Sequence, residues 1–359
     1  MEFKSASLHE LNQVIGLSVE TFKPNMKEQF RLLFSEDNLE HMLIAKDGNQ
    51  VVSEVNYYPS TIQIPHASIR VASIGSVCTD IHYRGQGLAS KLLQLAEQKM
   101  MEESISLAII SGDLGIYERF GAKDVGHMHQ FVAYANHTES SKEYGYRLFE
   151  KRDLKWMFET YLKEEVRFDR TFHEFETLLL GQTYPDTYCK YPIYIITKNN
   201  QRVAYVILSV YVEDPFMKIK EYAGNRHACI SLIQTFLKMH QKSSITWVST
   251  PLDPIHRVSP LYSFKPITQR ATLKMIHLGR FFSSIEPYIL QYDHLFRILE
   301  SSESEIKLHA KGHVIILNRD QALTMVFNGK THLRKKVVLN WVKTCFPLPM
   351  PWTHNLNYQ

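Results

Sequence analysis

Residues 77–93 read VCTDIHYRGQGLASKLL, and this stretch says most about the fold. It begins within an apolar, β-prone run (residues 74–79) and passes through a short loop rich in arginine and glycine. The loop leads directly into an amphipathic helix, which the spacing of apolar residues predicts over residues 88–101. Backbone N–H groups converge at the start of such a helix, and the helix dipole favours an anion there. Gly85 and Gly87 have no Cβ, so a phosphate group can approach the main chain closely.

Two common phosphate-binding loops do not fit this segment. The nucleotide-hydrolase loop needs glycine, four residues and then Gly-Lys-Ser/Thr, which is absent from this loop. The dinucleotide loop needs three glycines at fixed offsets, whereas this segment has only Gly85 and Gly87, with Ala89 beyond them. The alternative to an anion-binding loop is an ordinary strand-to-helix turn, in which the glycines are needed only for the backbone conformation.

The pattern Arg84-x-x-Gly87-x-Ala89 resembles the acetyl-CoA pyrophosphate loop of the GNAT N-acetyltransferases. In that family Arg/Gln-x-x-Gly-x-Gly/Ala follows a strand that ends in a Val-x-Thr-like triplet, which residues 77–79 match here, and residues 92–93 suit its helix. These flanking residues favour the family over a plain turn. The resemblance implies that acetyl-CoA is a co-substrate, and the binding residues that it implies are Val77, Cys78, Thr79, Arg84, Gly85, Gln86, Gly87, Leu88, Ala89 and Ser90.

A second segment supports the resemblance. Residues 106–112 form an apolar run of strand length, and residues 114–122 predict a short helix that ends at Gly121. Tyr117 and the residues after it resemble the second GNAT signature, Tyr-x-x-Phe-Gly-Phe/Ala. The resemblance implies that Tyr117 is the general acid that protonates the departing CoA thiolate, a role that suits a phenol because it is protonated at neutral pH. The alternative is an ordinary aromatic side chain facing the core.

The first 135 residues therefore predict a catalytic GNAT domain of the α/β (α+β) class. The resemblance implies the order β-α-α-β-β-β-loop-α-β-α-β, and the hydrophobic periodicity agrees with it. In that fold two parallel strands, which end here near Thr79 and Ser111, splay apart. The pantetheine arm of the co-substrate is expected between them, bonded to the backbone of Val77 and Thr79.

Residues 143–278 carry a weak echo of this domain. The order strand, turn, helix, strand recurs over residues 218–249, and residues 259–265 resemble residues 115–121. The turn, however, reads Gly-Asn-Arg-His (residues 224–227), without the glycine pattern of the first loop. We therefore expect a second, degenerate GNAT-like domain with a central mixed sheet that binds no CoA, and an unrelated α/β domain is the alternative.

Residues 279–359 predict a third, small α+β unit. Residues 281–301 have a helical pattern, residues 305–317 predict a hairpin, and residues 319–327 are helix-like. A proline-rich, aromatic tail follows from residue 346, which excludes a helix and predicts an extended, bound segment.

The whole layout resembles the enhanced intracellular survival (Eis) family, which has tandem GNAT domains, a sterol carrier protein-like C-terminal domain and a tail that enters the active site. The family's base is the terminal α-carboxylate, which implies a catalytic role for Gln359. In the alternative, the tail only buries apolar surface. Glu54, on a strand that faces the site, and Glu20 are the other candidate acids. Cys78 could be an acyl nucleophile, but it has no paired His-Asp signal, so core packing is preferred.

Composition narrows the remaining choices. The net charge of +4 without a long basic run does not indicate nucleic acid, and no apolar segment is long enough to span a bilayer. The four cysteines lie far apart and the 17 histidines are scattered, so reduced thiols and no metal are expected. The default location is the cytoplasm, and homo-oligomers are left open.

These observations predict an N-acetyltransferase that moves an acetyl group from acetyl-CoA to the primary amine of a small molecule, by direct attack in a ternary complex. The alternative from another class is an inactive regulator that binds CoA or lipid. Intact residues at the loop and at Tyr117 favour the enzyme.

Overall fold

The computed structural model describes residues 1–135, 143–258 and 263–358. They divide into two compact units. The first comprises residues 1–126, 268–348 and Tyr358, and the second comprises residues 127–267 and 349–357. The division into domains after residues 135 and 278, made from the sequence, stays a prediction.

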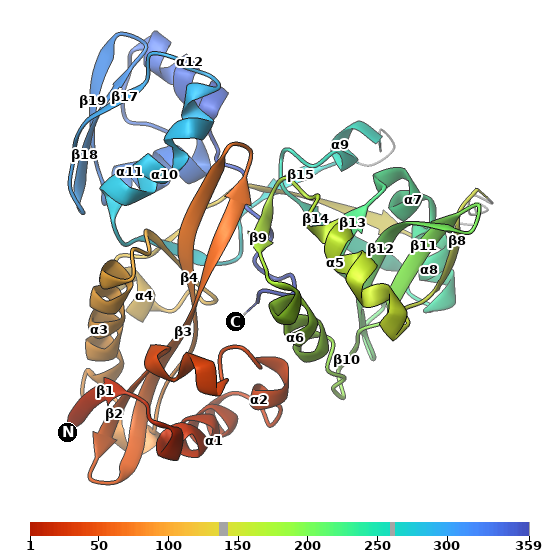
Figure 1. The fold of residues 1–359 in the computed structure, drawn as a ribbon, viewed down its shortest axis with the longest axis horizontal. Coiled ribbons are helices and arrows are strands. Elements are labelled where there is room, and N and C mark those ends of the chain that lie inside the picture. The colour runs from red at the N-terminus through yellow and green to blue at the C-terminus, as the bar shows by residue number, and fades with distance from the viewer. Residues whose placement is uncertain (136–142, 259–262, 359) are drawn as a thin grey trace. The chain divides into compact units, whose positions relative to one another are not determined.

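The first unit is built on a mixed sheet (Figure 1). In spatial order its strands are β1 (Glu2–Ser5), β2 (Met42–Asp47), β3 (Gln50–Ile64), β4 (Ala67–Thr79), β5 (Leu107–Ile110), β16 (Thr272–Met275) and β6 (Lys123–Asp124). Only β4 and β5 among these neighbours run parallel. The strand β16 comes from far along the sequence and pairs with both β5 and β6.

Alternation along β2 explains why helices cover both faces of this sheet. Leu43 and Ala45 pack in one cluster with the apolar side of α3 (Leu88–Glu102). Met42 and Ile44, which point to the opposite face, pack with α1 (Leu11–Thr21) and α2 (Met26–Gln29). The short helix α4 (Gly115–Arg119) follows β5, and 3-10 turns span Leu8–Glu10, Glu36–His41 and Ile81–Tyr83. The predicted strand–loop–helix order of this region is confirmed.

The C-terminal part of the first unit has a three-stranded antiparallel sheet with helices. Its elements are α10 (Leu278–Leu290), β17 (Arg297–Ser301), β18 (Glu305–Ala310), β19 (His313–Asn318), α11 (Arg319–Asn328) and α12 (Lys336–Cys345). The hairpin predicted over residues 305–317 is confirmed, but the helix predicted over residues 281–301 is wrong in its last part. Asp293 accepts bonds from the amides of Leu295 and Lys311, which ties the turn after α10 to the turn between β18 and β19. The chain therefore leaves the helix and pairs as β17 with β18.

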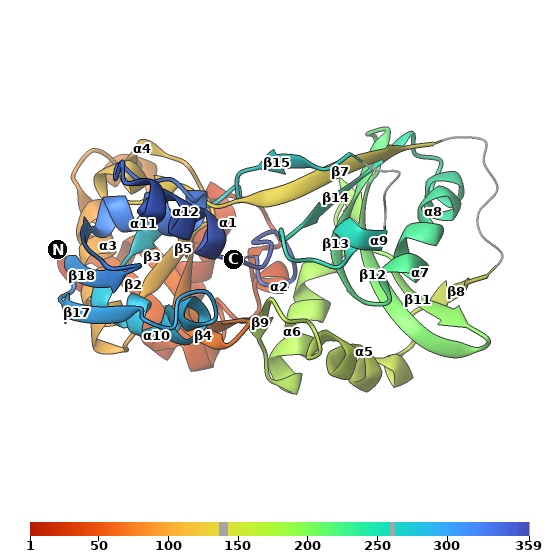
Figure 2. The ribbon, with the colours of Figure 1, turned by 90° about the horizontal axis from the view of Figure 1, so that it is seen from above.

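The second unit has its own mixed sheet. In spatial order its strands are β15 (Lys265–Ile267), β7 (Met128–Tyr134), β14 (Ser244–Ser249), β13 (Phe216–Gly224), β12 (Gln201–Tyr211), β11 (Ile193–Lys198) and β8 (Gly145–Leu148), and β10 (Cys189–Lys190) also pairs with β12. Its helices are α5 (Leu154–Tyr161), α6 (Phe172–Gln182), α7 (Arg226–Ser231), α8 (Ile233–Met239) and α9 (Ile255–Val258); a short strand, β9, spans Arg167–Asp169, and a 3-10 turn spans Lys151–Asp153. Helices α5 and α6 lie on one face of this sheet, and α7 and α8 lie on the other (Figure 2).

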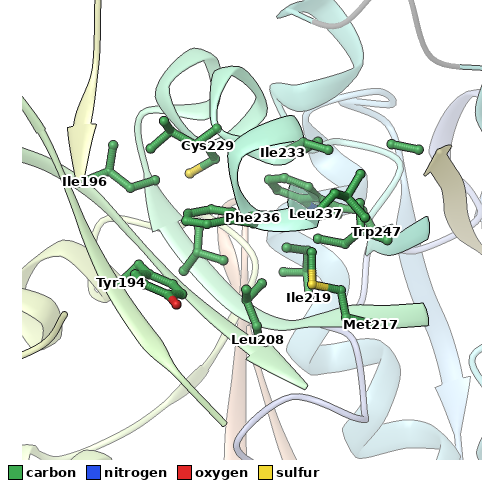
Figure 3. Packing of buried hydrophobic residues seen from close by; sticks show 14 of the residues in the cluster. Tyr194, Ile196, Leu208, Met217, Ile219, Cys229, Ile233, Phe236, Leu237 and Trp247 are labelled. Atoms are coloured by element: carbon green, nitrogen blue, oxygen red, sulfur yellow. The ribbon is translucent and has the colours of Figure 1, made fainter. Parts of the chain in front are cut away.

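The core of the second unit lies between its sheet and helices α7 and α8. Cys229, Ile233 and Phe236 from these helices pack against Tyr194 and Leu208 from the strands (Figure 3). Two sheets, each sandwiched by helices, and a small third sheet confirm the predicted α+β class with tandem GNAT-like folds. No helix among the described residues has both the length and the apolar character needed to cross a bilayer.

Candidate active site

Strands β4 and β5 separate where the co-substrate was expected. Their parallel pairing runs from Val71 with Leu107 to Ile74 with Ile110. Beyond that point β5 ends, whereas β4 continues to Thr79 with β3 alone as its partner. The last five residues of β4 therefore have a free edge toward α4, and this opening is where the sequence predicted that two strands splay.

The loop after β4 is shaped by two glycines. Gly85 has φ +78° and Gly87 has φ +76°, a left-handed conformation that side chains with a Cβ rarely adopt. A Cβ built on either residue meets no atom within 4 Å, so open space lies above both. Gly87 is the N-cap of α3, whose first amides have no partner inside the helix. These features fit a pyrophosphate at the start of α3.

Neighbouring side chains anchor this loop. The Tyr83 hydroxyl donates to Asp47 Oδ2 at 2.9 Å, and Arg84 Nε donates to the Thr79 carbonyl at 3.1 Å. The ammonium of Lys91, which could add charge at the loop, lies 3.8 Å from the centre of the Phe3 ring. Arg84, the two glycines and Gln86 are exposed, so the loop presents its backbone to solvent.

A β-bulge in β4 places a hydroxyl in the opening. Asn56 on β3 pairs with Gly75 and Val55 pairs with Val77, so Ser76 is the extra residue. Ser76 has φ +54° and donates from its Oγ to Glu54 Oε1 at 2.6 Å. The bulge thus turns a residue of an apolar strand toward a buried carboxyl group.

Glu54 is fully buried on β3. Burial raises its pKa to about 7, although hydrogen bonds from Ser18, Ser76 and Cys78 favour the charged form. The Ser18 hydroxyl also donates to Glu54 Oε1, and the Cys78 thiol donates to it at 3.2 Å. A carboxyl group with this pKa exchanges a proton near neutral pH.

Cys78 packs in the cluster of α1 and α2. It is 5% exposed, and burial, with Glu54 nearby, raises the pKa of its thiol far above the usual range. These are the properties of a packed thiol and not of an activated nucleophile.

Tyr117, on α4, lines the opening from the other side. Burial raises its pKa to about 12, helped by Cys78 and Tyr358. A Cβ built on Gly112 would come within 2.9 Å of Tyr117 Cε2, so the ring packs against bare backbone at the end of β5. The Gly112 carbonyl accepts from Thr272 on β16 at 3.0 Å, which fixes this backbone from behind.

These elements enclose a pocket of about 420 Å³ in the first unit. Its walls come from α2 and the residues before and after it, from the end of β4 with its bulge, from the segment between β5 and α4, and from Tyr117 and Tyr358. The lining residues are Phe22, Lys23, Met26, Phe30, Leu33, Ile74, Gly75, Ser76, Val77, Ser111, Gly112, Leu114, Tyr117 and Tyr358. Val77 and Tyr117 thus lie on one pocket with Ser76.

Two candidate acids remain. Gln359 lies outside the described residues, and Tyr358 before it packs with Phe30 at 6.1 Å between ring centres. Glu20 is exposed and does not line the pocket. In the part of the chain that the structure describes, no group of three or more His, Cys, Asp or Glu side chains is arranged to hold a metal ion.

In the second unit, the turn between β13 and α7 corresponds to the glycine loop, and a side chain of the protein already occupies it. The parallel pairing of β13 and β14 ends at Lys218 with Thr246, and β13 continues to Gly224. The Glu164 carboxylate accepts from the Gly224 amide at 3.0 Å and from Arg226 Nη1 at 2.9 Å. A side chain of the protein therefore takes the position of an anion at this turn.

Little space is left beside that turn. Asp253 accepts two further bonds from Arg226, at 2.9 and 3.0 Å. The cavity here measures about 70 Å³, and Pro351, Trp352 and Asn355 of the tail also line it.

The first part of the chain is similar to a known family of domains. Residues 2–125 match the family model described as an acetyltransferase (GNAT) domain. Among curated proteins, none matches this sequence at a significant level.

Solved structures share the fold of most of the chain. A GCN5-related N-acetyltransferase from Anabaena variabilis matches with a TM-score of 0.69 at 13% identity, over 98% of each chain. Another from Kribbella flavida matches with a TM-score of 0.59 at 13% identity, over 89% of this chain and 83% of that one. Eis1 from Mycobacterium abscessus matches with a TM-score of 0.57 at 11% identity, over 88% and 85%. The predicted likeness to GNAT and Eis-like structures is confirmed.

Sequence reasoning missed several residues of the pocket in the first unit. Ser76, Phe22 and Phe30 line it, and Ser18 bonds Glu54 below it. A signal existed for Ser76, because a Gly-Ser pair inside an apolar strand suggests a bulge. The aromatic residues carried no such signal, since their place depends on how α1 and α2 cross the sheet.

Proposed function

We propose that this protein is an acetyl-CoA-dependent N-acetyltransferase that acetylates a primary amine by direct attack in a ternary complex. The observation that carries the proposal is that the free edge of β4 and Tyr117 border one pocket, and that the glycine loop follows directly on the same strand. The Gly85 to Ser90 amides would hold the pyrophosphate of the co-substrate, with Arg84 adding positive charge. The backbone of Val77 and Thr79 would bind the pantetheine arm.

Tyr117 is the general acid in this proposal. In the reaction the amine nitrogen bonds to the acetyl carbon, the carbon–sulfur bond breaks, and the sulfur takes a proton. The raised pKa of Tyr117 keeps its hydroxyl protonated, so it donates at the moment when negative charge develops on sulfur. Positioning of two bound reactants supplies most of the rate, because a thioester needs little activation.

Glu54 is the base in this proposal, and Ser76 is the relay. Ser76 lines the pocket and already donates to Glu54, so it can accept a proton from the amine while passing its own to the carboxylate. A base with a pKa of about 7 is well matched to neutral pH. The Gln359 α-carboxylate stays the alternative base. One extra residue after Gln359 would displace that carboxylate, and activity that survives this extension but not Glu54→Gln supports the relay.

Substitution of Tyr117 tests the function. Tyr117→Phe removes only the hydroxyl, so kcat should fall about 100-fold while acetyl-CoA affinity is retained. Wild-type turnover is measured as free thiol released with a panel of primary amines, and affinity by titration calorimetry. If the wild type binds acetyl-CoA but transfers nothing to any amine, the chain is the inactive CoA-binding regulator instead.

A further inference from the structure

We infer that the acceptor of this enzyme is an apolar primary amine, with an alkyl or aryl group and no second positive charge. The inference rests on the proposed function, because it assumes that the pocket receives the amine. It concerns the wall that α2 and the residues before and after it supply to that pocket.

This wall is apolar and partly aromatic. Met26, Phe30 and Leu33 are 4%, 6% and 0% exposed and line the pocket from the helical side. Phe22 and Leu114, which are 51% and 63% exposed, line it where it meets solvent. Contact with these side chains favours an apolar group, since burial of each CH₂ raises affinity about fourfold.

The charges of the pocket argue against a polycation. No Asp or Glu is among its lining residues in the described part of the chain. Among the lining residues that the structure describes, the one charged side chain is Lys23, whose ammonium bonds Gln29 and lies 5.2 Å from the centre of the Phe30 ring. A second ammonium on the acceptor would meet this positive charge without an Asp or Glu side chain to pair with among the described lining residues.

The polar groups of the pocket are already engaged. Ser76 bonds Glu54 and Ser18, and a hydrogen bond joins Tyr358 and Ser111. Glu54 lies behind Ser76 and is fully buried, so it meets the reacting nitrogen only through that hydroxyl. The pocket therefore offers proton transfer at one end and apolar contact along the rest.

Hexylamine and 1,5-diaminopentane test this inference, because they differ only by a methyl group in place of an ammonium. With acetyl-CoA as donor, kcat/KM for hexylamine should exceed that for the diamine by about tenfold or more. Lys23→Glu should reduce this ratio about tenfold, mainly by improving the diamine. Lys27→Glu is the matched control, since it makes the same charge change at an exposed residue outside the pocket and should leave the ratio unchanged.

A second pair of variants tests the apolar wall. Phe22→Ala should raise KM for hexylamine and phenethylamine several-fold without changing acetyl-CoA affinity. Leu8→Ala, at an equally exposed residue outside the pocket, should change neither.

Three results would overturn the inference. One is equal or faster turnover of the diamine by the wild type. Another is a ratio that Lys23→Glu leaves unchanged. The third is a clear preference for hexanoyl-CoA over acetyl-CoA with no preference between the two amines, which would assign the apolar space to the acyl chain. In each case a primary amine is still acylated, so the first two results leave the proposed function intact and the third changes only the acyl group that it transfers. Failure of that function gives no turnover with either amine.

Discussion

At the scale of single residues, Glu54 carries the sharpest expectation. Its pKa of about 7 predicts that kcat/KM rises with pH through neutrality as the carboxyl group loses its proton. Glu54→Gln keeps the shape and cannot ionise, so this rise should disappear and kcat/KM should fall about 100-fold above pH 8. Rates measured from pH 5.5 to 9 on both proteins check this. An unchanged rise in Glu54→Gln would assign the titration to another group, such as the Gln359 carboxylate.

The pH dependence of the free energy of unfolding is an independent test of the raised pKa of Glu54. Because the folded pKa of Glu54 is raised above that of an unfolded glutamate, about 4.3, the folded state holds a proton that the unfolded state has lost between these values. The free energy of unfolding contributed by Glu54 is therefore fully present below pH 4 and is lost as pH rises through about 7. The difference in unfolding free energy between wild type and Glu54→Gln should shift in favour of the variant over that interval, as measured by urea unfolding.

Gly112 offers a test of how Tyr117 is positioned. A Cβ there would meet the Tyr117 ring at 2.9 Å, and the backbone behind it is held by Thr272, so the ring must move. Gly112→Ala should lower kcat about tenfold or more. Gly115→Ala is the matched control. Its Cβ makes only an ordinary contact with Arg119 at 3.5 Å, and Gly115 is the first residue of α4, where alanine is tolerated. Comparable losses in both variants would contradict the role of Gly112.

At the scale of elements, local sequence patterns predicted the strand, turn and helix of the site correctly, but they did not predict all of the strands around it. The strand β4, the turn at Gly85 and Gly87, and the helix α3 follow from local chemistry: β propensity, positive φ and apolar period. The strand β16 could not be foreseen, because its pairing with β5 joins segments more than 150 residues apart. The prediction of a helix over residues 297–301 was wrong for a related reason, since pairing with β18 overrides the helical pattern of that segment and makes it strand β17.

The glycine loop makes a prediction at this scale. Gly87→Ala places a Cβ at φ +76° in open space, so its cost in stability is conformational, about 1–2 kcal/mol. The N-terminus of α3 should relax with it, and acetyl-CoA affinity should fall about tenfold. Gly312→Ala is matched in φ (+77°) and open space but lies in the turn between β18 and β19. The control variant should lose a similar free energy of unfolding, measured with urea, and should keep its affinity for acetyl-CoA, measured by calorimetry. Equal losses of acetyl-CoA affinity in both variants would mean that the loop at Gly87 has no special part in binding.

At the scale of the whole molecule, the two units use the same strand–turn–helix differently. In the first, the turn exposes amides beside a pocket of about 420 Å³. In the second, Glu164 bonds the Gly224 amide, and Asn225 caps α7 through Ala228 at 3.0 Å. An internal carboxylate at that turn would repel a phosphate, and the cavity of about 70 Å³ has no room for a pantetheine arm.

The chain should therefore bind one acetyl-CoA, which titration calorimetry measures directly. Gly87→Asp should abolish binding, because aspartate tolerates positive φ but brings a negative charge to the start of α3. Asn225→Asp makes the same charge change at the corresponding turn of the second unit, and aspartate also caps helices, so one site of unchanged affinity is expected. Two sites in the wild type that fall to one in either variant would show that both units bind the co-substrate. That result would remove the contrast on which the assignment of a single catalytic domain depends.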